Sequence, residues 1–179
     1  MFLNIVTPCS RPQNLHKISE SINIPQENYR WIIVFDGTVK PNETLIPQNC
    51  EFYMHTNPLS KVGHSQRNFA LDLIEKGHVY FNDDDTLMHP ELWENIKDLD
   101  NDFITFYQEL KNGMLRLRGN VRLAHIDSHN FIISRDLIAN TKWVVNRYDA
   151  DGVFAIECHK KSKNHIIIHK VLSTYNVLR

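Results

Sequence analysis

Short apolar runs alternate with amphipathic stretches along the first part of the chain. The runs at 3–6 and 31–35 have the length and composition of buried strands, and two further strands are predicted at 51–55 and 78–81. Apolar residues at helical spacing indicate helices after Pro12 and at 63–75. This alternation is typical of βαβ units, so we expect an α/β fold with a mostly parallel sheet and flanking helices.

The pattern changes after a further helix that opens at Pro90. Stretches 103–109 and 114–118 flank Asn112-Gly113, a dipeptide that favours a hairpin turn. The remaining elements are predicted as strands at 131–133 and 166–168 and a helix at 151–160. Because no linker-like segment separates the two halves, we predict a single domain over 1–179, with a small mixed extension in its second half.

Composition narrows the class of protein. The 179 residues include 20 Lys+Arg and 21 Asp+Glu, a net charge of −1, whereas a nucleic-acid-binding domain is usually clearly basic. We therefore expect no nucleic-acid partner. No apolar stretch approaches the roughly 18 residues that span a bilayer, and residues 1–10 lack the features of a signal peptide. Three cysteines without CxxC spacing favour a reducing compartment, so we expect a cytoplasmic protein.

The strongest chemical signal is the run Asn82-Asp83-Asp84-Asp85, directly after the strand at 78–81. Adjacent carboxylates disfavour one another's ionised forms, and a hard divalent cation such as Mg²⁺ or Mn²⁺ relieves that cost. Ligands of open α/β sheets bind outside the carboxyl ends of the strands. We therefore predict a cation site here; the alternative is a solvated acidic turn that caps the next helix.

Two weaker signals fall at the same predicted edge of the sheet. Asp36 ends the strand at 31–35, where a carboxylate suits a base or ribose contact; the alternative is a simple Asp-Gly turn. Gly63 opens a helix whose first turn carries Arg67, a combination that suits a phosphate; the alternative is an ordinary helix start. Together the three signals predict a pocket for a nucleotide diphosphate.

These segments resemble the GT-A-fold glycosyltransferases, whose fold is Rossmann-like. The resemblance covers about the first hundred residues and rests on Ile5-Val6-Thr7-Pro8 with Arg11-Pro12, Trp31 to Asp36, Gly63 with Gln66-Arg67-Asn68-Phe69-Ala70-Leu71, and Val79 to Asp85. The last two motifs are most similar to those of the beta-1,3-glucuronyltransferases. The resemblance implies a hexosyl- or glucuronosyltransferase that uses Mn²⁺ or Mg²⁺ and a nucleotide-diphospho-sugar, a UDP-sugar, to glycosylate a carbohydrate or glycoconjugate acceptor.

The resemblance also implies roles for individual residues. Asp36 would contact the uracil, Asp83 would face the ribose and contact the cation, and Asp85 would bind the cation that bridges the two phosphates. Arg67 would line the diphosphate site. The other expected nucleotide contacts are Thr7, Pro8, Arg11, Lys61, Gly63 and Asp84. Residues 1–100 would thus form the nucleotide-binding half.

The second half resembles small bacterial and viral GT-A enzymes. The segment 125–131 resembles the part that lines their acceptor and donor-sugar pocket, and 148–154 resembles the acidic helix start that supplies the base in inverting enzymes. Asp151 would be that base, with Asp149 as the competitor; the alternative for Asp151 is a helix N-cap. Residues 101–179 would thus form the acceptor-binding half.

Two further expectations concern the C-terminal region. His165 and His169 lie about 13 Å apart on a strand, too far to share one zinc ion, so His169 is a candidate for an additional contact to the divalent cation or else a surface histidine. A peripheral contact with a membrane or a partner chain also stays open, and the candidate residues for it are Trp143, Tyr175 and Arg179.

Three other functions stay open. A nucleotidyltransferase also needs acidic metal ligands, but it usually has a Gly-rich, basic phosphate loop, and the turn at 7–12 contains no glycine. A sugar-nucleotide-binding module would bind the donor without transfer. A metal-stabilised structural domain would bind the metal without a nucleotide.

Overall fold

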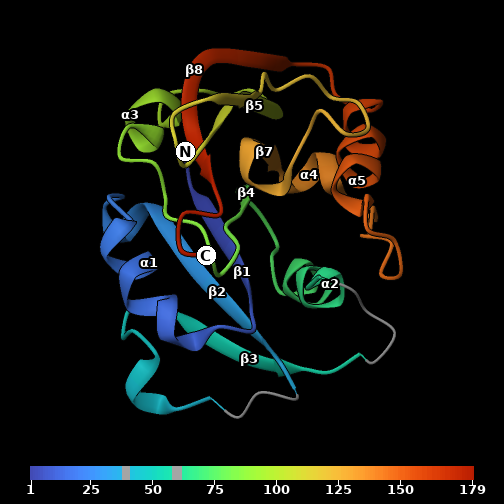
Figure 1. The fold of residues 1–179 in the computed structure, drawn as a ribbon. Coiled ribbons are helices and arrows are strands. Elements are labelled where there is room, and N and C mark those ends of the chain that lie inside the picture. Colours follow the sequence, from blue (N-terminus) through green and yellow to red (C-terminus); the bar gives the residue numbers. More distant parts are fainter. Residues whose placement is uncertain (38–40, 58–61) are drawn as a thin grey trace.

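One mixed sheet organises the chain in the computed structural model, which describes residues 1–37, 41–57 and 62–179 (Figure 1). Its described strands follow the order β3-β2-β1-β4-β7-β5-β6, with β8 paired to β5. The strands are β1 (Leu3–Cys9), β2 (Tyr29–Asp36), β3 (Glu51–His55), β4 (His78–Phe81), β5 (Phe103–Leu110), β6 (Leu115–Leu117), β7 (Phe131–Ser134) and β8 (His165–Tyr175). The hairpin predicted around Asn112-Gly113 is confirmed, because β5 and β6 pair antiparallel.

Strand direction divides the sheet into two parts. Strands β3, β2, β1 and β4 pair in parallel, and β8 pairs in parallel with β5. Strand β7 lies between β4 and β5 and is antiparallel to both. The predicted α/β class and the mixed second half are therefore confirmed.

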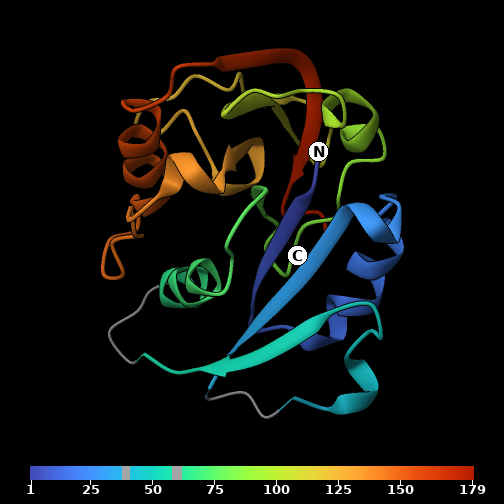
Figure 2. The ribbon, with the colours of Figure 1, turned by 180° about the vertical axis from the view of Figure 1, so that it is seen from behind.

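Helices cover both faces of the sheet (Figures 1 and 2). They are α1 (Leu15–Ser21), α2 (His64–Asp72), α3 (Leu92–Ile96), α4 (Arg135–Ile138) and α5 (Ala150–His159), with short 3-10 turns η1 (Pro12–Asn14), η2 (Gln26–Asn28), η3 (Glu43–Leu45) and η4 (Ser128–Asn130). Alternate residues of each buried strand point to opposite faces, so the sheet separates two hydrophobic cores. One core packs α1 and α3, and the other packs α2, α4 and α5.

Strand β8 differs most from its predicted extent. An apolar run predicted only 166–168, but the strand continues to Tyr175 because it pairs with β5 along most of its length. Its later residues include polar side chains that sequence periodicity does not mark as a strand. Among the described residues, no helix combines the length and apolar character that a membrane crossing needs.

The strand directions bring several connecting segments to one edge of the sheet. The chain segments after β1, β2, β4 and β8 leave the sheet at this edge, where the parallel strands have their carboxyl ends. Figure 1 shows the segment after β8 returning to the loop after β4. Because β7 runs the other way, the residues that precede it reach the same edge.

Candidate functional site

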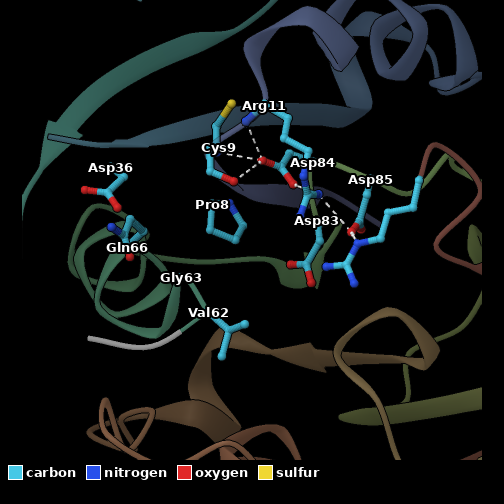
Figure 3. A pocket seen from close by; sticks show the side chains of 12 residues that line it. Pro8, Cys9, Arg11, Asp36, Val62, Gly63, Gln66, Asp83, Asp84 and Asp85 are labelled. Atoms are coloured by element: carbon cyan, nitrogen blue, oxygen red, sulfur yellow. Dashed lines mark hydrogen bonds and ion pairs between the residues drawn. The ribbon is translucent and has the colours of Figure 1, made fainter. Parts of the chain in front are cut away.

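The three consecutive carboxylates after β4 have different surroundings (Figure 3). Asp84 is buried, and its Oδ2 accepts hydrogen bonds from the backbone nitrogens of Ser10 (2.6 Å) and Arg11 (2.7 Å) and from the Ser10 hydroxyl (3.0 Å). Its Oδ1 accepts from Arg11 NH1 at 2.6 Å. Asp84, expected as a nucleotide contact, therefore fastens the turn after β1 to the loop after β4.

Asp83 and Asp85 instead form a cluster with His129. One ligand atom from each of the three residues lies within 4.8 Å of the other two. Nε2 of His129 is 3.2 Å from Oδ2 of Asp83. Two carboxylates suit Mg²⁺ or Mn²⁺ and an imidazole suits a first-row transition ion, so this donor set fits a divalent cation, and Mn²⁺ better than Mg²⁺.

His129 was expected only as part of a pocket-lining segment, and its place in the cluster follows from strand direction. Strand β7 pairs antiparallel with β4, with Tyr80 opposite Ile132. Continuing that register by three residues sets His129 opposite Asp83, and the Asp83 backbone nitrogen lies 3.0 Å from His129 Nε2. The antiparallel pairing of β7 with β4 therefore places His129 in the cluster, and a single sequence carries no signal for that pairing.

Charged neighbours control protonation in this cluster. Burial alone would raise the pKa of Asp83, but Arg67 and His129 outweigh it and hold this pKa well below its usual range. Burial alone would lower the pKa of His129, but the carboxylates of Asp83 and Asp127 raise it to about 10. A cation at this position would take the place of positive charge that His129 and nearby arginines supply.

Two arginines contact the same oxygen of Asp85. Arg11 NH1 is 2.8 Å and Arg179 Nε is 2.6 Å from Oδ2 of Asp85. Arg11 is also anchored on Asp84 through its backbone and its side chain, whereas the Arg179 side chain is 54% exposed. A cation bound to Asp85 would therefore displace Arg179 more readily than Arg11.

The start of α2 brings a second cation beside the acidic run. Gly63 caps the helix at φ +77°, and a Cβ there would lie 2.6 Å from the Cβ of Pro8, so only glycine permits this close approach. Arg67 in the first turn is buried; its guanidinium pairs with Asp83 and lies 4.7 Å from the centre of the Trp143 ring. Lys61, also expected as a nucleotide contact, lies outside the described residues.

A cavity of about 240 Å³ is lined by residues of all three motifs predicted in the first half, namely Asp36, Gly63 and Asp83. Figure 3 shows Asp36 and Gln66 at one end of it and Asp85 at the other, with Pro8 between them. This order matches the predicted sequence of base, phosphate and cation elements. Thr7 does not line it: the side chain is fully buried, and its hydroxyl donates to the Asn82 carbonyl at 2.7 Å.

A second cavity, of about 370 Å³, shares Asp83, Asp85 and Arg179 with the first and is lined on its other side by the second half of the chain. Asp151 lines it from the first turn of α5. Burial, and then the charge of Asp127, raise the pKa of Asp151 to about 6. Such a carboxylate is partly protonated near neutral pH, which suits proton transfer.

Asp149 has a different environment, although it lines the same cavity. It is the N-cap residue of α5, it pairs with Arg147 at 2.7 Å, and its side chain is 46% exposed. The hydrogen bond from Arg147 lowers the pKa of Asp149. Asp151 lies inside the helix, and its carboxylate accepts from the adjacent Gly152 nitrogen at 2.7 Å, so the N-cap alternative for Asp151 does not hold.

The structure decides two expectations for the C-terminal region, with His169 an exposed residue as in the surface-histidine alternative. His169 lies in the middle of β8, where its Nδ1 is 2.8 Å from the Tyr107 hydroxyl, and it is not part of the Asp83, Asp85 and His129 cluster. Trp143 is only 2% exposed and stacks on Phe154 with ring centres 4.6 Å apart, so it cannot meet a membrane.

Comparison with known proteins identifies the architecture. No protein-family model and no curated protein matches the chain. A crystal structure of S. aureus TarS 1–349 matches with a TM-score of 0.76 and 16% identity over 97% of this chain and 60% of that one. The mannosyltransferase PcManGT from Pyrobaculum calidifontis, in complex with GDP-Man and Mn²⁺, matches with a TM-score of 0.74 and 12% identity, covering 98% and 56%. The chain has a GT-A-type fold.

The GT-A likeness extends to a TarS structure that contains UDP-GlcNAc, with a TM-score of 0.75 and 15% identity over 97% of this chain. The chain spans 60% or less of the length of each of these structures. Almost the whole chain therefore aligns with these GT-A structures, whereas each of the neighbours contains a large part that has no counterpart in this chain.

Proposed function

We propose that this chain is a glycosyltransferase that moves a sugar from a nucleotide-diphospho-sugar to an acceptor hydroxyl with the help of a divalent cation. One observation carries the proposal: the cluster of Asp83, Asp85 and His129 lies where two cavities meet. We assign the nucleotide to the first cavity, which Asp36 and Gly63 line, and the acceptor to the second, where Asp151 is suited to proton transfer. GT-A neighbours with UDP-GlcNAc or with GDP-Man and Mn²⁺ support the same assignment.

The first cavity would hold the nucleotide diphosphate. Asp36 would accept a hydrogen bond from the base, and Gly63 would allow the diphosphate to approach the backbone at the start of α2. Asp83, Asp85 and His129 would hold the cation, which would neutralise charge on the leaving diphosphate. Arg67, beside Asp83, would contribute fixed positive charge to the same region.

The second cavity would hold the donor sugar and the acceptor. Asp151 would accept the proton of the acceptor hydroxyl during attack on the anomeric carbon. A single displacement of this kind inverts the anomeric configuration. Product NMR tests this point, and a retained configuration would contradict it.

Two observations bear on whether the donor nucleotide is UDP or GDP. The Gln66-Arg67-Asn68 and Asp83-Asp84-Asp85 motifs resemble those of beta-1,3-glucuronyltransferases and favour UDP. The GT-A neighbours include one structure with UDP-GlcNAc and one with GDP-Man. We therefore propose a UDP-sugar as the donor and test GDP beside it.

Calorimetric titration of UDP and GDP, each with and without Mn²⁺, tests the proposal. We expect Mn²⁺-dependent UDP binding that Asp85→Ala removes and that Asp98→Ala, a change at an exposed carboxylate outside both cavities, leaves intact. Binding of GDP instead would keep the reaction class and overturn the donor assignment. Binding of neither nucleotide would overturn the proposed function.

A further inference from the structure

The imidazole of His129 lies between two carboxylates. Its Nε2 faces Asp83, with 3.2 Å to Oδ2, and its Nδ1 faces Asp127, with 3.1 Å to Oδ1. The side chain is only 2% exposed. Nε2 also accepts a hydrogen bond from the Asp83 backbone nitrogen at 3.0 Å, so the ring proton belongs on Nδ1. Nδ1 is buried without a regular hydrogen bond among the described residues, and Asp127 Oδ1 is the carboxylate oxygen beside it. A buried ring of this kind is oriented by what its two nitrogens face.

Asp127 is itself held in one position from several directions. Its Oδ1 accepts from the His129 backbone nitrogen at 3.2 Å, and its own backbone nitrogen donates to Asn130 Oδ1 at 2.9 Å, which together form a capping box at η4. Its Oδ2 accepts from Arg116 NH1 at 2.9 Å. The carboxylate therefore has little freedom to turn away from His129.

Arg116 compensates the buried charge of Asp127. Its guanidinium carbon lies 3.8 Å from the centre of the Tyr175 ring, and its NH1 also contacts Gln108. A buried carboxylate is costly unless it is paired and hydrogen-bonded, so this support lets Asp127 remain ionised beneath the site. These supporting residues come from β5, β6 and β8, in the second half of the chain.

We propose that Asp127 is a positioning residue of the cation site: it holds the proton of His129 on Nδ1 and so keeps Nε2, the ring nitrogen beside Asp83, unprotonated for the cation held by Asp83 and Asp85. The inference rests on the cation site of the proposed function. In metal-binding histidines, the N–H of the second ring nitrogen commonly donates a hydrogen bond to a carboxylate, which fixes the tautomer and raises the basicity of the ligand nitrogen. Asp127 would not touch the cation or the substrates.

A double-mutant cycle on Mn²⁺ affinity tests whether Asp127 acts through His129. We expect Asp127→Asn to weaken Mn²⁺ binding about 10- to 100-fold in the otherwise unaltered chain. In a His129→Ala background the same change should alter the affinity by less than about twofold, because the residue it positions is gone. Asp102→Asn is the matched control, since Asp102 accepts backbone hydrogen bonds from Lys163 and Asn164 away from both cavities.

NMR of the unaltered protein gives a second readout that does not depend on the stability of a variant. Long-range ¹H–¹⁵N correlations of the ¹⁵N-histidine-labelled chain, saturated with diamagnetic Mg²⁺, report which ring nitrogen of His129 carries a proton. We expect the proton on Nδ1. A proton retained on Nε2 would overturn the inference.

The outcomes separate this inference from the proposed function. Equal losses of Mn²⁺ affinity in both backgrounds, or no loss in either, would overturn the positioning role alone. If the unaltered chain bound neither Mn²⁺ nor a nucleotide, the proposed function would fail and this inference with it.

Discussion

The parallel strands β3-β2-β1-β4 and the mixed strands β7-β5-β6-β8 supply the candidate site by different routes. In the parallel part, site residues come directly at or after the carboxyl ends of strands, as Asp36 and Asp83 do. In the mixed part, His129 precedes its strand, and Asp151 comes from a helix. The first route is visible in the sequence as a strand followed by a polar residue, and the second is not.

Strand direction therefore decides which end of a strand faces the candidate site. The rule that ligands bind outside carboxyl ends applies to parallel strands. For an antiparallel neighbour such as β7 the rule reverses, and η4 before the strand reaches the site. Strand β8 follows the parallel rule again, since the segment after it places Arg179 on Asp85.

The largest expected effect tests the catalytic contribution of the mixed part. Asp151→Asn keeps the size of the side chain but removes the proton acceptor, so we expect transfer to fall about 10²- to 10⁴-fold with nucleotide affinity unchanged. The measurement is product formation under saturating donor. Asp149→Asn is the matched control and should retain transfer, because Asp149 pairs with Arg147. Wild-type turnover in Asp151→Asn would show that the base lies elsewhere.

The same residue predicts a pH-dependent change in stability. The pKa of Asp151 is raised to about 6 in the folded state, so its ionisation disfavours folding as pH rises from about 4 through 6. Asp151→Asn removes this cost, with an upper bound of about 3 kcal/mol at pH 7.5 and little effect at pH 4. Denaturant unfolding of both proteins at the two pH values measures it. An equal gain in the free energy of unfolding at pH 4 and at pH 7.5 would contradict the raised pKa of this buried carboxylate.

A pair of glycine substitutions tests the parallel part. Gly63→Ala and Gly113→Ala both place a side chain at positive φ, and each should cost roughly 1–2 kcal/mol of stability. A Cβ at Gly113 meets nothing within 4 Å, whereas one at Gly63 would press on Pro8 in the wall of the first cavity. We therefore expect about tenfold weaker UDP binding, equivalent to about 1.4 kcal/mol, only for Gly63→Ala. Equal UDP affinities of the two variants, measured by calorimetry, would show that the turn at Gly63 does not contribute to nucleotide binding.

The smallest expected effect concerns the segment after β8. Arg179 competes with a cation for Asp85, so Arg179→Ala should strengthen Mn²⁺ affinity by about two- to fivefold. The effect is small because more than half of the Arg179 side chain is exposed and solvent screens its charge. Arg147→Ala removes another exposed arginine from an ion pair, that with Asp149, and should leave Mn²⁺ affinity unchanged. Weaker Mn²⁺ binding by Arg179→Ala would show that the arginine supports the cation instead of competing with it.

Local sequence signals accounted for much of the fold and part of the site. Runs at 51–55 and 78–81 coincide with β3 and β4 because each is an apolar or aromatic run between loops. The acidic run is a strong signal because three consecutive carboxylates at the end of a buried strand disfavour one another's ionised forms. The individual roles at the nucleotide site remain predictions.

The missing parts depend on contacts between distant residues. His129 joins Asp83 only because β7 pairs antiparallel with β4, and a single sequence does not reveal that pairing. Trp143 looked like an exposed aromatic because its burial comes from stacking on Phe154 and His64, one of which lies 79 residues earlier in the chain. Asp127 has no separate signal in the sequence, since it caps η4 whereas its partner Arg116 lies in β6.

X-ray diffraction at the manganese absorption edge would test the central claim most directly. The crystals would contain Mn²⁺ and whichever of UDP and GDP binds in solution. The account predicts one anomalous peak bounded by Asp83, Asp85 and His129, in contact with the diphosphate in the adjoining cavity. A bound nucleotide with its manganese peak elsewhere, or with none, would contradict the assignment of this cluster as the cation site.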